Sequence, residues 1–127
     1  MTRYVLDASA VLAIIRDEPG ADIVLSRMSG ALMSTVNVSE TVMRSSERGF
    51  SVDLVRSLLV SSEVTMMDFG IDLAFAAAGL RSATKALGLS FADRACLALA
   101  IRENAVAVTA DRKWGNANVS CPVELIR

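Results

Sequence analysis

The amino-acid sequence predicts an α/β fold in which a short parallel sheet carries helices on both faces. Its 127 residues, 53% of them hydrophobic and 21% charged, are typical of one ordered globular domain. Short apolar runs without polar alternation predict strands that are buried on both faces. These runs alternate with longer helical segments along the chain, and strands that alternate with helices form parallel sheets.

The first strand and helix make a βα unit. Residues 4–6 (Tyr-Val-Leu) favour a strand, which ends at Asp7. Ser9 then precedes an apolar segment over residues 10–15 that favours a helix, and Pro19-Gly20 ends it.

A second unit of the same kind follows. Residues 21–28 are predicted to be helical, and residues 31–36 to form the second strand. The next helix is expected over residues 39–48, which places Glu40 in its first turn. Gly49 occupies the position just past a helix end, where glycine is favoured.

The rest of the chain continues the alternation. Gly88 is a favourable end for one helix, and Ser90 is a favourable N-cap for the next. The remaining expected elements are helices at residues 51–61, 72–87 and 91–104 and strands at residues 64–67, 105–109 and 123–126. Because the carboxyl ends of parallel strands meet at one edge of the sheet, a functional site is expected at that edge.

Charge and histidine content exclude several functions. Thirteen Lys and Arg residues against 14 Asp and Glu residues give a net charge of -1, so no global positive field attracts nucleic acid. A polyanion would need a local basic patch or a bound cation. The sequence contains no histidine, which excludes Ser-His-Asp hydrolysis and every zinc site that uses histidine.

The remaining composition suggests a setting in the cell. Cys96 and Cys121 form no C-x-x-C motif and are expected to be ordinary core residues in a reducing compartment. The chain starts without the apolar stretch of a signal peptide, and its longest late apolar run, residues 95–101, is far below the ~20 residues of a membrane span. We expect a soluble cytoplasmic protein. Its mean hydropathy of +0.45 predicts surface covered by a second copy or another protein.

Four carboxylates stand out by their positions. Asp7 and Asp111 follow strands, whereas Glu40 and Asp93 lie in the first turns of helices, all at the edge where a site is expected. Asp93 is the most informative because the helix around it is otherwise almost entirely apolar. Each acid has a structural alternative: helix-dipole stabilisation for Glu40 and Asp93, helix capping for Asp7 and an ordinary turn for Asp111.

Gathered carboxylates repel one another, and a hard divalent cation relieves that repulsion. Oxygen ligands without histidine or a usable cysteine pair favour Mg²⁺ or Mn²⁺ over zinc or copper. The hydroxyls of Ser9 and Thr109 could support water or a ligand there, or serve only as a helix cap and a strand end. Because Mg²⁺ held by carboxylates usually binds phosphate oxygens as well, phosphoester hydrolysis is the leading prediction.

Three segments of the chain carry longer motifs. They are residues 5–13 (VLDASAVLA) with Glu18-Pro19-Gly20 after them, residues 88–100 (GLSFADRACLALA) and residues 108–114 (VTADRKW). In this order they resemble PIN-domain ribonucleases, and most of all the VapC toxins of bacterial toxin–antitoxin pairs. The resemblance covers nearly the whole chain, so residues 1–127 are expected to be one PIN-like nuclease domain.

The resemblance implies a site, a cofactor and partners. By it, the residues that bind one or two Mg²⁺ or Mn²⁺ ions and cut RNA are Asp7, Glu40, Asp93 and Asp111. Members of the family often carry a further acid after the fourth, and here Asn116 offers only a neutral amide oxygen, which leaves the number of ions open. A small cognate antitoxin protein is also implied, and the apolar excess of the chain predicts a homodimer.

Basic residues near these acids are candidate contacts for RNA phosphates. They are Arg44 and Arg48, on the helical face of Glu40, and Arg112 and Lys113 after Asp111. The alternative is ordinary solvated charge or pairing with nearby acids. Trp114 is a candidate for stacking on an unpaired base, or for packing over the sheet edge.

Rival families are less well matched. A two-component receiver domain, with Asp68 as its phosphorylated residue, needs an acidic pair after the first strand, where this chain has only Asp7. A haloacid dehalogenase phosphatase needs a second aspartate where Ser9 stands. A non-catalytic adaptor with the PIN fold is the non-enzymatic alternative.

Overall fold

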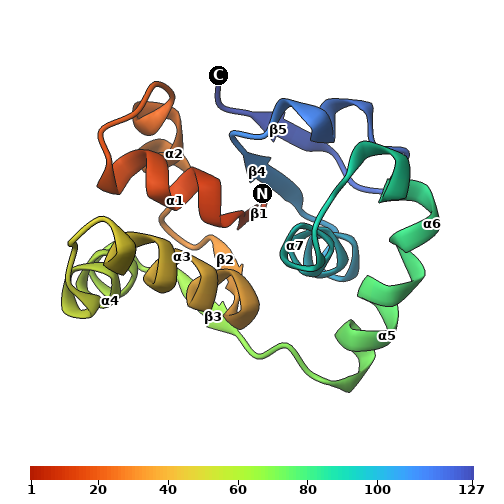
Figure 1. Cartoon of the computed structure of the whole chain (residues 1–127), viewed down its shortest axis with the longest axis horizontal. Helices are drawn as coiled ribbons and strands as arrows, with labels where there is room; N and C mark the ends of the chain where they lie inside the picture. Colours follow the sequence, from red (N-terminus) through yellow and green to blue (C-terminus); the bar gives the residue numbers. More distant parts are fainter.

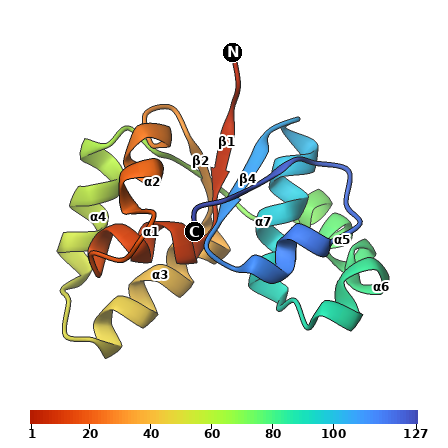
Figure 2. The same ribbon diagram turned by 90° about the horizontal axis from the view of Figure 1, so that it is seen from above.

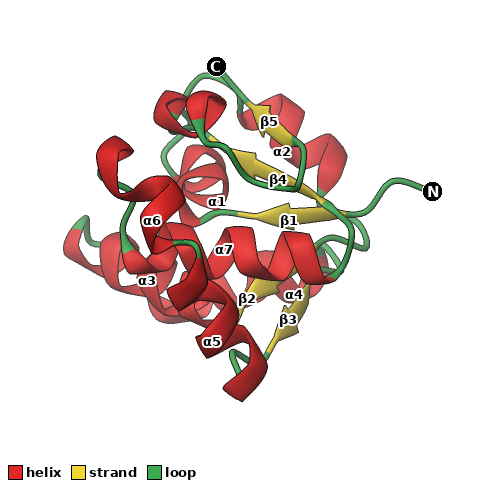
Figure 3. Cartoon of the chain, turned by 90° about the vertical axis from the view of Figure 1, so that its right-hand side faces the viewer, coloured by secondary structure: helices red, strands yellow, loops and turns green.

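A five-stranded parallel sheet runs through the centre of the protein, as described for residues 1–127 by a computed structural model (Figure 3). The order across the sheet is β3-β2-β1-β4-β5, with β1 in the middle. The strands are β1 (Tyr4–Leu6), β2 (Leu32–Ser34), β3 (Thr65–Met67), β4 (Val106–Thr109) and β5 (Val123–Leu125). The carboxyl ends of all five therefore lie at one edge of the sheet.

Seven helices cover both faces of the sheet (Figures 1 and 2). One layer contains α1 (Ala8–Ile15), α2 (Ala21–Arg27), α3 (Thr35–Glu47) and α4 (Val52–Ser61). The other contains α5 (Ile71–Gly79), α6 (Arg81–Thr84) and α7 (Phe91–Arg102). This confirms the predicted fold class of a parallel sheet with helices on both faces.

Consecutive residues of the central strands supply two separate cores. Val5 and Leu32 pack in the core beneath α5 and α7, whereas Leu6 and Met33 pack in the core beneath α1, α2 and α4. All four side chains are almost completely buried. Because both faces of each strand are covered, the strands show apolar runs rather than polar alternation.

The second strand is shorter than predicted, and the helix after it begins earlier. The strand expected over residues 31–36 ends at Ser34, whose hydroxyl accepts a hydrogen bond from the backbone N of Val36 (3.3 Å) and so caps α3. Since α3 begins at Thr35, Glu40 lies in its second turn, and the prediction of a first-turn position was wrong.

The completely buried residues of α3 are polar, although the helix contains several β-branched residues. Asn37, Thr41 and Ser45 are completely buried. The side-chain amide of Asn37 donates to the carbonyl of Ala92 at the start of α7 (3.0 Å), and the Thr41 hydroxyl donates to the Asn37 carbonyl (2.7 Å). The Asn37 bond joins α3 to α7, whereas the Thr41 bond stays within α3, so a tertiary contact fixes this helix in addition to its local propensity.

The single long helix predicted over residues 72–87 was wrong. It is divided into α5, α6 and a 3₁₀ turn over Lys85–Leu87, which ends at Gly88. The Arg94 guanidinium donates a hydrogen bond to the carbonyl of Ala77 (2.9 Å) near the end of α5. The Thr84 hydroxyl donates to the Leu80 carbonyl (2.8 Å). Both bonds satisfy carbonyls near the break, where the helix ladder is interrupted.

The other boundaries differ by smaller amounts. The first helix starts two residues earlier than expected, the helix predicted over residues 91–104 ends at Arg102, and the helix predicted over residues 51–61 follows the Ser51 cap. A 3₁₀ turn over Arg112–Asn116 was not anticipated. The remaining helix and strands lie within one residue of the prediction at each end.

Two further expectations concern the core and membranes. Cys96 and Cys121 are free thiols buried in the core beneath α5 and α7, which confirms their expected role as core residues. None of the helices combines the length and the apolar character that crossing a membrane requires.

Gly20 is a position where the fold requires glycine. Its φ is +95°, and an added Cβ would lie 2.5 Å from the carbonyl oxygen of Ile126. Gly30 has a similar φ of +79° but open space around it. The turn before α2 therefore packs closely against the residue after β5. An added side chain would clash with backbone at Gly20 but not at Gly30.

We predict that Gly20→Ala lowers the free energy of unfolding by about 3 kcal/mol, because it combines a left-handed backbone with a steric clash. The matched control Gly30→Ala should lose only about 1 kcal/mol, since it has the backbone strain alone. Urea denaturation of both variants measures the difference. Equal losses would contradict the close packing of Gly20 on Ile126.

Candidate active site

A cavity of about 430 Å³ opens at the carboxyl edge of the sheet. All four acids predicted from the sequence line it, although they come from distant parts of the chain. Its lining consists of Asp7, Ala8, Ser9, Glu40, Arg44, Gly88, Ser90, Asp93, Ala110, Asp111, Lys113 and Arg127. The parallel sheet brings these residues together because β1, β2 and β4 are neighbours whose carboxyl ends face the same way.

Asp7 is the most deeply buried acid in this cavity, with only 3% of its surface exposed. Its Oδ2 accepts hydrogen bonds from the hydroxyls of Ser9 (2.7 Å) and Thr109 (2.9 Å). Its Oδ1 is buried and has no hydrogen-bond partner. Asp7 occupies the N-cap position of α1 without a side-chain capping bond, so the capping alternative for Asp7 is wrong.

The two hydroxyls form a polar link between the first and fourth strands. Ser9 Oγ also accepts from the backbone N of Ala110 (2.9 Å), and Thr109 Oγ1 accepts from the backbone N of Asp111 (3.1 Å). The hydroxyl oxygens lie 3.1 Å apart. Ser9 therefore does not cap α1. Both residues orient Asp7 and fix the backbone that leads to Asp111.

Glu40 reaches the cavity from α3. Its side chain is 17% exposed, and its Oε2 lies 3.2 Å from the guanidinium of Arg44, one turn further along the helix. Arg44 is half exposed and lines the same cavity. Arg44 is thus paired with a nearby acid, which was the alternative to a contact with RNA phosphate.

Asp93 has a structural function as well as a place in the cavity. Its Oδ2 accepts from the backbone N of Ser90 (2.8 Å), and the Ser90 hydroxyl accepts from the backbone N of Asp93 (3.2 Å). This reciprocal pair is a capping box at the start of α7. Asp93 therefore lies in the first turn of α7, as the alternative of helix stabilisation requires, and it also lines the cavity.

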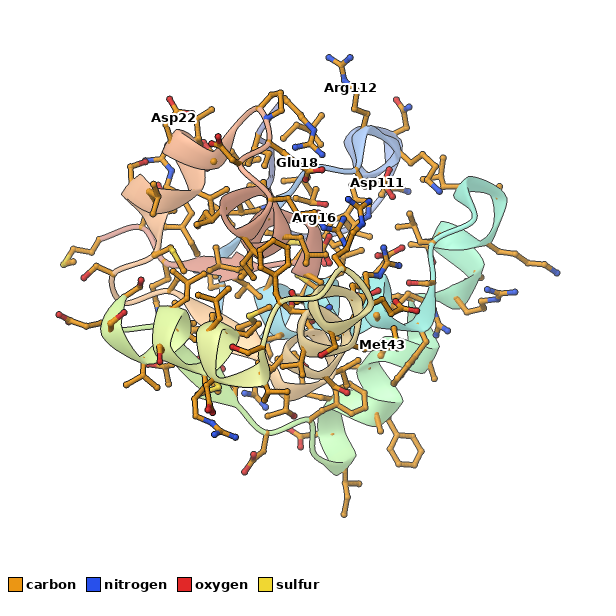
Figure 4. All side chains as sticks on the ribbon, turned by 60° about the vertical axis from the view of Figure 1, so that its left-hand side comes forward. Arg16, Glu18, Asp22, Met43, Asp111 and Arg112 are labelled. Atoms are coloured by element: carbon orange, nitrogen blue, oxygen red, sulfur yellow. The ribbon has the colours of Figure 1, made fainter.

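Asp111 begins the turn after β4. Its Oδ1 accepts from the backbone N of Lys113 (3.0 Å), and its Oδ2 lies 3.8 Å from Lys113 Nζ. Asp111 therefore does cap a turn, as its structural alternative proposed. Asp111 and Lys113 both line the cavity. Arg112, in contrast, is exposed and extends away from Asp111 into solvent (Figure 4).

Four other residues considered from the sequence lie outside the cavity lining. Thr109 is completely buried behind it and touches Asp7 by its hydroxyl. Arg48 and Asn116 are exposed beyond it. Trp114 is 1% exposed and packs in the core beneath α5 and α7, so the packing alternative is confirmed and its ring is not free to stack on a base.

One basic residue of the cavity was missed. Arg127 follows β5 and lines the cavity, although it is far in sequence from every motif. No pattern within the sequence marks it, because its position depends on β5 lying beside β4.

The matching family is the PIN domain, whose model covers residues 4–119. The chain belongs to the PIN domain family. This confirms the resemblance carried by the three motifs around Asp7, Asp93 and Asp111. None of the curated proteins compared with this PIN domain matches it significantly.

Several solved structures share its fold. A toxin–antitoxin complex from Klebsiella pneumoniae superposes with a TM-score of 0.77 at 15% identity, covering 98% of each chain. VapC20 from Mycobacterium tuberculosis, a sarcin-ricin loop cleaving toxin, gives 0.77 at 17% identity over 92% of this chain and 96% of that one. VapBC2 from Rickettsia felis, bound to promoter DNA, gives 0.70 at 20% identity over 97% and 98%.

The family assignment removes two rival interpretations. A receiver domain and a haloacid dehalogenase phosphatase are both wrong, because the chain is a PIN domain. Asp68, the residue that the receiver interpretation required, is exposed after β3 and does not line the cavity.

Burial dominates the electrostatics of Asp7. Its pKa is raised to about 6, chiefly by burial and further by the negative charges of Asp93 and Glu40. The hydrogen bonds from Ser9 and Thr109 act in the opposite direction. The charged form of Asp7 is therefore held in place at a considerable energetic cost.

The neighbouring acids show the same pattern more weakly. Burial raises the pKa of Glu40, with a further rise from Asp93 and an opposing effect of Arg44. Burial also raises the pKa of Asp93, against the hydrogen bonds from Ser90, and the charge of Asp111 adds to the rise. A cation in the cavity would relieve this repulsion.

The side chains of the cavity fit a hard divalent cation. The possible metal ligands among these side chains are oxygen atoms of Asp, Glu and Ser, which suit Mg²⁺ or Mn²⁺. Asp7 Oδ1 is a buried acceptor without a donor, which a cation would satisfy. No three acidic or cysteine side chains are gathered closely enough to hold an ion as they stand. Mg²⁺ needs no such cage, because it usually keeps several waters and binds one or two carboxylates.

We predict that Asp7→Asn stabilises the metal-free protein at neutral pH. The folded pKa of Asp7, about 6, lies above its ordinary value of 3.8, so the unfolded chain releases this proton first as pH rises. Stability is therefore lost between about pH 4 and pH 6, and Asp7 costs about 3 kcal/mol above that range. The amide removes this cost.

Urea denaturation in EDTA at pH 4 and pH 8 measures the effect. Asp7→Asn should unfold with a higher free energy than the wild type at pH 8 and with little difference at pH 4. The exposed Asp68→Asn is the matched control and should show no such pH dependence. Destabilisation by Asp7→Asn of equal size at both pH values would contradict the prediction.

Proposed function

We propose that this PIN domain is a metal-dependent endoribonuclease, the toxin of a toxin–antitoxin pair, which hydrolyses RNA phosphodiester bonds. The observation that carries the proposal is one cavity lined by four carboxylates, of which the buried Asp7 has an oxygen without a hydrogen-bond partner. Family membership supports it, because the structural neighbours include VapC and VapBC proteins.

The proposed catalytic carboxylates are Asp7, Glu40, Asp93 and Asp111. A bound Mg²⁺ or Mn²⁺ would supply a water of lowered pKa and positive charge for the phosphate. Ser9 and Thr109 hold Oδ2 of Asp7, which leaves Oδ1 for the ion. With Asn116 outside the cavity lining, a fifth ligand from that position gains no support.

Basic residues of the cavity would bind the RNA backbone. Arg44 and Lys113 each sit beside one of the acids and can exchange that partner for a phosphate oxygen. Arg112 points away from Asp111, so we assign it no contact at the scissile bond. An RNA substrate also places the proposed activity in the cytoplasm.

A protein partner and self-association complete the proposal. One neighbouring structure is a toxin–antitoxin complex, and VapBC2 from Rickettsia felis is another neighbour. Large apolar side chains are exposed on α5, with Ile71 at 80% and Phe75 at 78%, and this surface suits a second copy of the chain. A small antitoxin could inhibit by placing an arginine among the acids, where its charge replaces that of the cation.

The second candidate is a non-catalytic adaptor that binds RNA or protein. The absence of three acids gathered closely enough to hold an ion favours it. The unpartnered oxygen of Asp7 and the raised pKa values of three cavity acids favour the enzyme instead, because an adaptor has no use for buried carboxylates that repel one another.

We predict that RNA cleavage requires Mg²⁺ or Mn²⁺ and that Asp93→Asn abolishes it. The amide oxygen can still accept the hydrogen bond of Ser90, so the capping box and the fold should survive, while the charge is lost. Cleavage of single-stranded RNA is measured with metal and with excess EDTA, and circular dichroism reports the fold.

Asp68→Asn provides the control for this experiment, because Asp68 is exposed and outside the cavity. Its activity should equal that of the wild type. Cleavage that persists in EDTA would refute metal dependence, and full activity of Asp93→Asn would refute the assignment of Asp93.

We predict that expression of this chain alone slows bacterial growth, whereas Asp93→Asn expressed to the same level does not. Co-expression of the small open reading frame beside its gene should restore growth and yield a complex. Equal growth defects from both proteins would separate toxicity from the acidic site. A neighbouring product that neither binds nor rescues would refute the toxin–antitoxin assignment and leave the ribonuclease proposal intact.

A further inference from the structure

Arg127 is held at the rim of the cavity by the turn between α1 and α2. Its guanidinium donates to the carbonyl of Pro19 (2.8 Å) and lies 3.6 Å from Oε1 of Glu18. Gly20 in the same turn sits directly against the backbone of Ile126. These contacts fix the approach of Arg127 to the cavity from the side of β5.

The ion pairs of the cavity distinguish Arg127 from the other two cations. Arg44 is paired with Glu40, and Lys113 lies near Asp111, so each already offsets one of the four cavity acids. Arg127 is paired with Glu18, which does not line the cavity. Among the three, only Arg127 can bind a substrate anion without uncovering one of the proposed catalytic carboxylates.

We propose that Arg127 binds a backbone phosphate of the RNA substrate next to the scissile one and so positions the strand. The inference rests on the proposed nuclease function. A guanidinium presents several N–H donors in one plane, so it can keep its bond to Pro19 and still offer N–H groups to a phosphate. The phosphate then replaces Glu18 as its anionic partner.

Four variants separate this role from a structural one. Arg127→Ala removes charge and hydrogen bonds, Arg127→Gln keeps a donor for the Pro19 carbonyl without charge, and Arg127→Lys keeps the charge. Arg56→Ala is the matched control, because Arg56 is an exposed arginine paired with Asp53 and lies outside the cavity. All are made in the Asp93→Asn background to prevent cleavage during binding.

Fluorescence anisotropy with a labelled single-stranded RNA, with Mg²⁺ at several salt concentrations, measures binding. Arg127→Ala and Arg127→Gln should both raise Kd about fivefold and lower the slope of log Kd against log salt by about 0.7, as expected for one lost phosphate contact. Arg127→Lys and Arg56→Ala should stay within about twofold of the parent.

Two outcomes overturn the inference: an unchanged Kd for Arg127→Ala, or equal Kd values for the Gln and Lys variants, which would show that Arg127 only anchors the turn. A wild-type protein that binds RNA with Mg²⁺ or Mn²⁺ but leaves it intact refutes the proposed function, and the Kd comparison still decides the role of Arg127. Absence of RNA binding by every variant refutes both.

Discussion

The burial of the Asp7 carboxylate at the end of the central strand is the constraint on which the site depends. One of its oxygens is held by Ser9 and Thr109, and the other has no partner. The same hydroxyls hold the backbone after β4, so the geometry of Asp7 and of the segment that carries Asp111 is set by one network. A buried, incompletely satisfied acid weakens a fold, and such groups are retained where they have a function.

The polar face of α3 has a corresponding role for the other two acids. Through Asn37 the helix is bonded to the start of α7, next to Asp93. Glu40, one turn after Asn37, is thereby kept at a constant position relative to Asp93. A buried hydrogen bond, which is directional, thus fixes the helix against α7.

Most elements could be predicted from the sequence because their cause is local. Apolar runs over β1 and β4, the Ser51 and Ser90 caps, and Gly88 act within a few residues. The errors arise where distant groups decide. Residues 35–36 are helical because Ser34 caps α3 and the polar face of α3 meets α7. The helix that begins at Ile71 is interrupted near the Ala77 carbonyl, which accepts a hydrogen bond from Arg94 of α7.

The sequence by itself determined the fold class and the PIN family, and it marked the four acids that line the cavity, because strand-end positions and motif order are written along the chain. Only the tertiary structure decided which oxygen of Asp7 is free, that Asp93 also caps α7, that Arg112 points away and that Arg127 enters the cavity. The physical reason is that side-chain direction and burial depend on neighbours from other strands and helices. Those neighbours come together only when β5 pairs with β4 and α3 packs on α7.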